Sequence, residues 1–181
     1  MSKSQPHDKP TGNGRSSQDI PRGIAAQLRE RDLLLSVKED TTKAKESLRR
    51  LADFYCGQGD YRAAFASLRR LADWEHDLEE KARCVLAMGG VAELKEDFEA
   101  AAGYYREALA LEPTQRDVWY FINHNLAYSL NKLARFEEGE KFCRAAADIC
   151  PERPNAHKNL GIALVGQGRF REAAASRSEE H

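Results

Sequence analysis

A short pattern of side chains recurs four times between residues 45 and 181, and it constrains the fold more than any other feature of the sequence. Each copy has a large apolar residue, then Ala or Gly, a second apolar residue three positions on, an aromatic residue six positions later and a small residue three after that. The copies begin 37, 38 and 34 positions apart. Such a period predicts stacked helical units. The marks are Leu51, Ala52, Tyr55, Tyr61 and Ala64; Met88, Gly89, Ala92, Phe98 and Ala101; Leu126, Ala127, Leu130, Phe136 and Gly139; and Leu160, Gly161, Leu164, Phe170 and Ala173.

The marks have a direct physical interpretation. The small residue lets two helices approach closely, because a larger side chain would push them apart, and the later aromatic side chain fills the gap across the helix pair. Gly59 and Gly168 stand just before the aromatic position, where the chain must turn sharply. Asp60 and Asp97 follow that turn and can cap the next helix. The pattern therefore predicts an all-α fold built from helix pairs.

The chain before the repeats divides into two segments. Residues 1–18 have almost no apolar side chains, and we expect them to form a disordered tail. Residues 19–40 carry an amphipathic stripe and predict an N-terminal helix, with Glu39–Thr42 as a short connection after it. The stripe consists of Ile24, Leu28, Leu34, Leu35 and Val37.

The repeated pattern resembles the tetratricopeptide repeat, and the resemblance covers residues 45–181. It is closest in the second copy, at Gly89, Phe98, Ala101, Tyr105, Ala108 and Pro113. The large aromatic residue expected early in each first helix is replaced by Leu48, Val85, Asn123 and His157. The resemblance implies a right-handed α-solenoid of four repeats, with the last one incomplete. We place these repeats at residues 45–81, 82–119, 120–153 and 154–181.

Composition and motifs exclude several functional classes. The 28 Lys and Arg residues balance 29 Asp and Glu residues, so we expect neither nucleic acid nor a membrane as partner. The phosphate-binding, zinc-protease and hydrolase motifs are missing from the sequence. We therefore expect no enzyme, no catalytic residue and no cofactor. The four cysteines form no CxxC pair, which makes the cytoplasm the expected compartment.

Two of the cysteines and a histidine share a seven-residue spacing. Cys143, Cys150 and His157 follow one another at this interval, but a metal site needs three or four converging ligands. Pro151 introduces a turn before the histidine. We therefore expect no metal site and interpret the cysteines as small side chains buried between helices.

In such a solenoid, the first helix of each repeat lines the inner groove. Counting from the small residue predicts a groove-facing set in the C-terminal half that combines amide, aromatic and basic side chains. This predicted binding set is Phe121, His124, Asn125, Tyr128, Asn131, Lys132, Asn155, Lys158 and Asn159. Asn125 and Asn159 occupy the same site in successive repeats, and a side-chain amide there can both donate to and accept from a peptide backbone. The alternative is that these amides bond within the scaffold.

The resemblance implies a protein-interaction module that holds a peptide or protein segment in its groove. The competing hypothesis is a structural or self-assembling protein that makes its contacts through the solenoid ends. The C-terminal end in particular supplies Leu160, Leu164 and Phe170 with only a short polar helix to cover them, which predicts weak homodimers. The sequence does not identify the partner.

Overall fold

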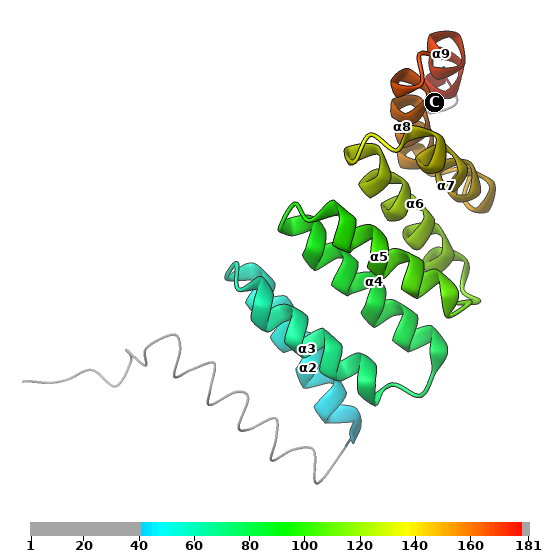
Figure 1. Cartoon of the computed structure of the whole chain (residues 1–181). Helices are drawn as coiled ribbons and strands as arrows, with labels where there is room; N and C mark the ends of the chain where they lie inside the picture. Colours follow the sequence, from blue (N-terminus) through cyan, green and yellow to red (C-terminus); the bar gives the residue numbers. More distant parts are fainter. Residues whose placement is uncertain (1–40, 179–181) are drawn as a thin grey trace, which may run out of the picture.

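The computed structural model describes residues 41–178, which form eight α-helices and contain no strand (Figure 1). The predicted tail at 1–18 and the predicted helix at 19–40 lie outside the described residues, and the helix labels therefore begin at α2. The helices are α2 (Thr41–Gly57), α3 (Tyr61–Trp74), α4 (Leu78–Leu94), α5 (Phe98–Ala110), α6 (Arg116–Lys132), α7 (Phe136–Ile149), α8 (Pro154–Gly166) and α9 (Phe170–Ser178).

The helices pack as four successive antiparallel pairs, α2/α3, α4/α5, α6/α7 and α8/α9. Each helix packs on the next one in the chain, and α6 also contacts both α4 and α8. In Figure 1 the pairs stack one after another from α2 and α3 to α8 and α9. This arrangement confirms the predicted all-α solenoid of helical repeats.

Two of the expected repeat boundaries fall inside helices. The expected break at 81/82 lies within α4, which already begins at Leu78, and the break at 119/120 lies within α6, which begins at Arg116. The third boundary, at residue 154, coincides with the start of α8. The earlier start of α4 has a local cause: Asp77 caps the helix by accepting from Glu79 N at 2.8 Å. At the first pair, α2 begins at Thr41 and therefore includes both threonines of the expected connection.

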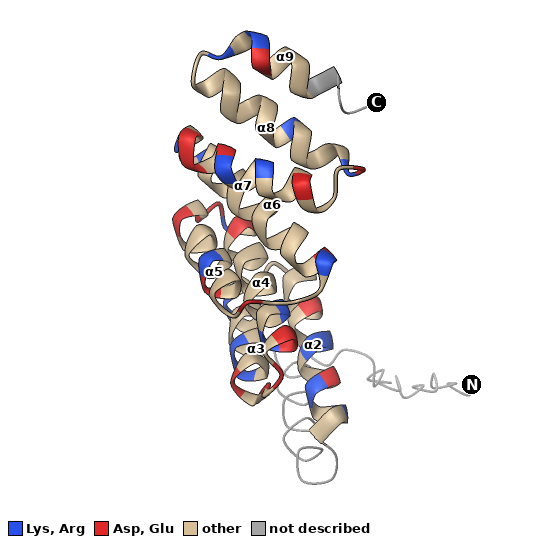
Figure 2. Ribbon diagram, turned by 90° about the vertical axis from the view of Figure 1, so that its right-hand side faces the viewer, with Lys and Arg blue, Asp and Glu red and all other residues tan. Residues whose placement is uncertain are grey.

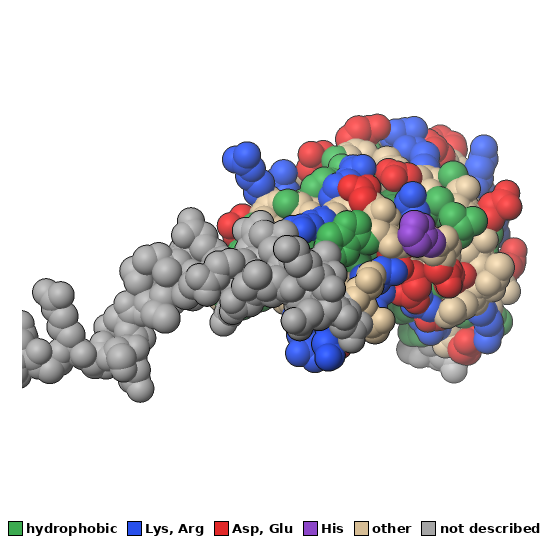
Figure 3. Space-filling model, turned by 90° about the horizontal axis from the view of Figure 1, so that it is seen from below, with side chains coloured by type: hydrophobic (Ala, Val, Ile, Leu, Met, Phe, Trp, Pro, Cys, Tyr) green, Lys and Arg blue, Asp and Glu red, His purple; other side chains and the backbone are tan. Residues whose placement is uncertain are grey.

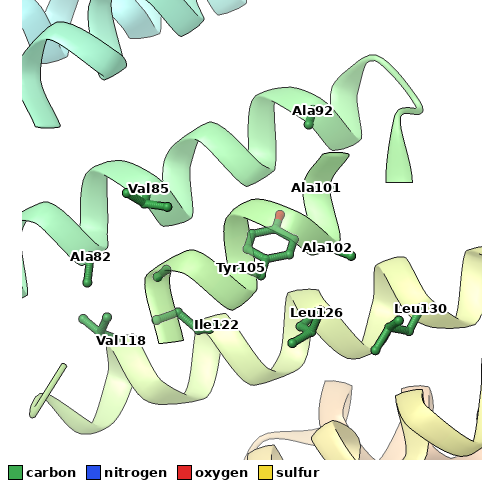
Figure 4. Packing of buried hydrophobic residues seen from close by; sticks show 11 residues of the cluster. Ala82, Val85, Ala92, Ala101, Ala102, Tyr105, Val118, Ile122, Leu126 and Leu130 are labelled. Carbon is green, nitrogen blue, oxygen red and sulfur yellow. The ribbon is translucent and has the colours of Figure 1, made fainter. Parts of the chain in front are cut away.

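The largest hydrophobic cluster lies where α4, α5 and α6 meet, and Tyr105 of α5 is at its centre (Figure 4). The tyrosine ring is fully buried and points between α4 and α6. Its neighbour on α4 is Gly89, where an added Cβ would lie only 2.7 Å from ring atoms Cδ1 and Cζ. Real Cβ contacts are never this short, so the predicted close-approach position is confirmed in the second pair.

The turn inside each pair uses a left-handed backbone conformation at the same relative position. Gly59 and Gly168 have φ of 73° and 75°, as the sequence predicted. Glu96 and Ala134 adopt nearly the same φ, 58° and 57°, although a Cβ makes this conformation costly. The predicted caps at Asp60 and Asp97 are also confirmed, because each accepts from the backbone N–H three residues ahead. The turn geometry is therefore set by the fold, and glycine only lowers its cost.

This comparison predicts opposite effects for two reciprocal substitutions. Ala134→Gly should raise the free energy of unfolding by about 0.5 kcal/mol, because relief of left-handed strain exceeds the added entropy of the unfolded chain. Gly168→Ala should lower it by about 1 kcal/mol. Urea unfolding of both variants measures the difference. The same sign of change in both would contradict a shared turn geometry.

Ion pairs connect neighbouring helix pairs along the whole described chain, and Figure 2 shows both charge signs interspersed from α2 to α9. On the first helices Arg49 meets Glu80 at 2.6 Å. On the second helices Arg106 meets Glu138 at 2.6 Å. Further pairs across the same kind of boundary are Arg83–Asp117, Arg116–Glu152, Arg135–Glu99 and Arg169–Glu140. Most arginines of the described helices are therefore used within the scaffold.

Candidate interaction groove

A groove of about 420 Å³ lies between α6 and α8. Seven of the nine predicted binding residues line it, together with Ile162. The lining residues are His124, Tyr128, Asn131, Lys132, Asn155, Lys158, Asn159 and Ile162. Helical periodicity explains the agreement, because residues three or four positions apart share one face of a helix. Phe121 and Asn125 do not line the groove.

The groove has a positive electrostatic character. Lys132 and Lys158 are both exposed, and neither forms an ion pair with any residue between 41 and 178. The ammonium of Lys132 lies 5.4 Å above the Tyr128 ring and 5.8 Å above the Phe98 ring, so cation–π contacts hold it in place. No carboxylate lines the groove. The site therefore presents two cations and one apolar side chain, Ile162, to a ligand.

His124 is the only titratable imidazole in this lining. Its ring stacks on Tyr120 with centroids 5.6 Å apart, and its Nδ1 accepts from Asn159 Nδ2 at 3.3 Å. Burial lowers the pKa of His124 below its usual value, because the charged form would lose hydration. The imidazole is therefore neutral at pH 7 and does not add to the positive charge of the groove.

The amides require a correction. Asn159 was expected to offer its amide to a peptide in the groove, yet it is only 5% exposed, and its side chain bonds to His124 within the scaffold. Asn131 likewise donates from Nδ2 to the Asn159 carbonyl at 3.0 Å, which ties α6 to α8. Asn125 is half-buried on another face of α6. Asn155 is exposed at the groove and is free to bind. The scaffold interpretation thus holds for Asn131 and Asn159.

Phe121 forms a different cluster beside the groove. It is 41% exposed and meets Tyr120 edge to face at 5.4 Å. The Arg153 guanidinium covers both rings, 4.5 Å from the Tyr120 centroid and 4.9 Å from the Phe121 centroid. Sequence reasoning missed Arg153, because it lies in the connection before α8, where the repeat pattern marks no position. A basic residue directly before a helix with Pro at its start is the only local signal.

The N-terminal half offers fewer free charges than its composition suggests. Arg49 of α2 is paired with Glu75 and Glu80. Glu75 also meets Lys45 at 2.6 Å and is itself buried. These contacts make the charged N-terminal surface part of the scaffold and leave the α6–α8 groove as the candidate site.

Comparison with protein families identifies the repeats. One family model of the tetratricopeptide repeat matches residues 84–118, and a second matches residues 122–153. This is a tetratricopeptide repeat protein. The matched ranges cover α4/α5 and α6/α7, and the repeats indicate a protein-interaction scaffold.

Solved structures share the fold of this tetratricopeptide repeat protein at low sequence identity. A crystal structure of MamA has a TM-score of 0.68 at 19% identity, covering 86% of this chain and 84% of that one. The structure of MamA from Desulfovibrio magneticus RS-1, from residue 41 to the end, has a TM-score of 0.61 at 16% identity. The match covers 86% of this chain and 92% of that one. A tetratricopeptide repeat protein from Parabacteroides merdae ATCC 43184 has a TM-score of 0.65 at 17% identity. The match covers 75% of this chain and 51% of that one. No curated protein matches the chain by sequence.

The cysteines of this tetratricopeptide repeat protein pack mostly inside the fold. All four are free thiols; Cys84, Cys143 and Cys150 are buried, as predicted, whereas Cys56 is half-buried. Burial raises the pKa of Cys84 to about 11 and that of Cys143 to about 12, which keeps both thiols protonated at pH 7. Between residues 41 and 178, no three His, Cys, Asp or Glu side chains are arranged to hold a metal ion. None of the described helices has the length and hydrophobicity needed to span a bilayer.

Proposed function

We propose that the groove between α6 and α8 binds an extended acidic peptide segment of a protein partner. The observation that carries this proposal is the pair of exposed lysines, Lys132 and Lys158, in a groove without carboxylates. Most arginines of the described helices form an ion pair with a carboxylate of the scaffold, whereas these two lysines form none with the described residues. A ligand carboxylate therefore gains two cations without competing against a nearby acid.

The dimensions of the groove suit a short segment. His124 and Lys132 are eight residues apart on α6, which corresponds to about 12 Å along the helix axis. An extended chain covers this distance with about four residues. Ile162 is 44% exposed on the α8 side and can contact an apolar ligand side chain. The proposed ligand thus combines two acidic side chains with an apolar one between them.

A binding assay with a defined probe tests the proposal. The probe is a fluorescein-labelled hexapeptide, Glu-Glu-Leu-Leu-Glu-Glu, and the reference has Gln in place of every Glu. We expect the acidic probe alone to bind, and Lys132→Ala with Lys158→Ala to weaken its binding about tenfold to hundredfold, because two charge-assisted contacts are lost. Fluorescence anisotropy at two salt concentrations measures the affinity.

The matched control replaces two exposed lysines away from the groove, Lys95 and Lys141, with Ala. This control has the same change in net charge, so it separates local contacts from the general field of the protein. Equal weakening by both double variants, or equal binding of the Gln peptide, would overturn the acidic-peptide proposal.

A second candidate function is self-association through the C-terminal end, and Phe170 supports it. Its counterparts are covered by the following helix pair: Phe98 meets Tyr128 at 6.1 Å, and the Phe136 ring fills the space beside Gly166. Phe170 begins α9 in the same position, yet it is 66% exposed. An aromatic side chain in a pairing position without a partner among the described residues favours a second copy as its contact.

Sedimentation velocity over a wide concentration range tests this second candidate. We expect a dimer fraction that grows with concentration in the parent and disappears in Phe170→Glu. Leu94→Glu is the control, because Leu94 is 57% exposed at the end of α4, away from the C-terminal pair. A strict monomer at every concentration would contradict self-association.

A further inference from the structure

The first helix pair has an apolar cavity that no described helix covers. A space of about 190 Å³ lies between α2 and α3, and most of the side chains that line it are apolar. The lining residues are Leu48, Leu51 and Tyr55 from α2 and Ala63, Ala66, Ser67 and Arg70 from α3. Figure 3 views this end of the solenoid, where hydrophobic side chains reach the surface among charged ones. A partly open, mostly apolar space between two otherwise well-packed helices can accept apolar side chains from a further segment.

The second helix pair shows what covers the equivalent surface. The first two copies of the repeat are 37 residues apart, so Ala63 and Ser67 correspond to Ala100 and Tyr104. These two residues face α3 of the preceding pair, and the Tyr104 ring lies 5.1 Å from that of Phe65. In the second pair, the surface is therefore covered by the second helix of the pair before it.

The same shift of 37 residues places the segment 24–37 in register with α3. All five residues of its apolar stripe coincide with apolar positions of that helix. The pairs are Ile24 with Tyr61, Leu28 with Phe65, Leu34 with Leu71, Leu35 with Ala72 and Val37 with Trp74. The connection agrees as well, because three residues separate Trp74 from α4 and three separate Val37 from α2.

Two buried apolar positions of α3 have polar counterparts in the segment, and the packing explains both. Gln27 and Arg31 stand where α3 has Ala64 and Leu68. Those two α3 residues pack in one cluster with Ala52 of their own first helix. The residue that corresponds to Ala52 is Arg15, in a stretch without apolar side chains. A helix without a first helix of its own has polar side chains on that face.

We propose that residues 24–37 form the second helix of a half-repeat and pack, within the same chain, on the α2–α3 surface that includes Leu51, Tyr55, Ala63 and Ser67. The repeat array then begins one helix before α2. The half-repeat closes the N-terminal apolar surface and leaves the α6–α8 groove accessible, since the two lie on different helix pairs.

Hydrogen–deuterium exchange of the full chain tests this inference. Amides of residues 28–37 should exchange at least about a hundredfold more slowly than an unstructured chain. Leu28→Glu and, separately, Ala63→Glu should abolish this protection, because each places a carboxylate in the proposed contact. Amides of α6 should keep their protection in both variants, which shows that the remaining solenoid is folded.

Two neighbouring positions give matched controls. Arg29→Glu alters the next residue of the segment, outside the apolar stripe. Arg62→Glu alters an exposed residue of α3 that does not line the cavity and whose counterpart, Glu99, is also exposed. Both controls should retain the protection. Exchange at the unstructured rate in the parent would overturn the proposal, and so would protection that rises with protein concentration, because the segment would then occupy a second copy.

Discussion

Gly89→Leu is expected to lower the free energy of unfolding by about 3 kcal/mol, at the upper end of what overpacking costs. The reason lies in the contact between α4 and α5. A Cβ at residue 89 already overlaps the Tyr105 ring, and the ring is fully buried, so it has no free space to enter. The helices must separate or the tyrosine must leave its rotamer. Urea unfolding followed by circular dichroism measures the loss.

Gly90→Leu provides the matched control for this substitution. Gly90 is the next residue of the same helix, and an added Cβ there has no atom within 4 Å. Replacing glycine inside a helix should leave stability unchanged or raise it by up to about 1 kcal/mol. If both variants lose the same stability, the Gly89–Tyr105 contact is not the cause.

Tyr105→Ala should destabilise the protein at least as much as Gly89→Leu, and we expect it to lower the free energy of unfolding by about 3–5 kcal/mol. The ring fills the space between α4, α5 and α6, and these helices cannot collapse around a void without moving their neighbours. Tyr104→Ala is the control, because Tyr104 is half-buried and lies beside Phe65 at the surface between the first two pairs. Tyr104→Ala should lower the free energy of unfolding clearly less than Tyr105→Ala in the same experiment.

The double variant Gly89→Leu with Tyr105→Ala separates the two effects. The leucine side chain would enter the volume that the tyrosine ring vacates, so the combined loss should be smaller than the sum of the single losses. Non-additivity of this kind is expected only for residues in direct contact. Simple additivity would show that the two positions act independently and would contradict the observed packing.

The fold was largely predictable, because helix packing imposes a period that side chains display. The marks at Gly89 and Phe98 were sufficient to predict a helix pair and its close contact. The left-handed turns at Glu96 and Ala134 were not predictable, since neither residue type favours that conformation. The start of α4 was not predictable for a similar reason. Its cap, Asp77, precedes the apolar pattern and is not one of the residues that mark the repeat, so α4 begins before the expected boundary at 81/82.

The sequence predicted which helix faces line the candidate site, but not how deeply each side chain on those faces is buried. Periodicity identified the face of each helix that carries Tyr128 and Lys158. It does not tell how far a side chain on that face is covered by the neighbouring helix, and Asn159 is buried for this reason. Arg153 was missed because its contact with Phe121 depends on the path of a connection, which no helical period describes.

The nearest-neighbour packing of the helices has a mechanical consequence. Every extensive helix contact joins elements that are adjacent or one apart in the chain, so no contact fastens α2 to α9. Tension applied to the two ends would therefore meet no single clamp. Helix pairs would peel off one after another at low force, and the released pairs could restack when the load falls. A scaffold built this way stretches between its attachments and yields gradually under load.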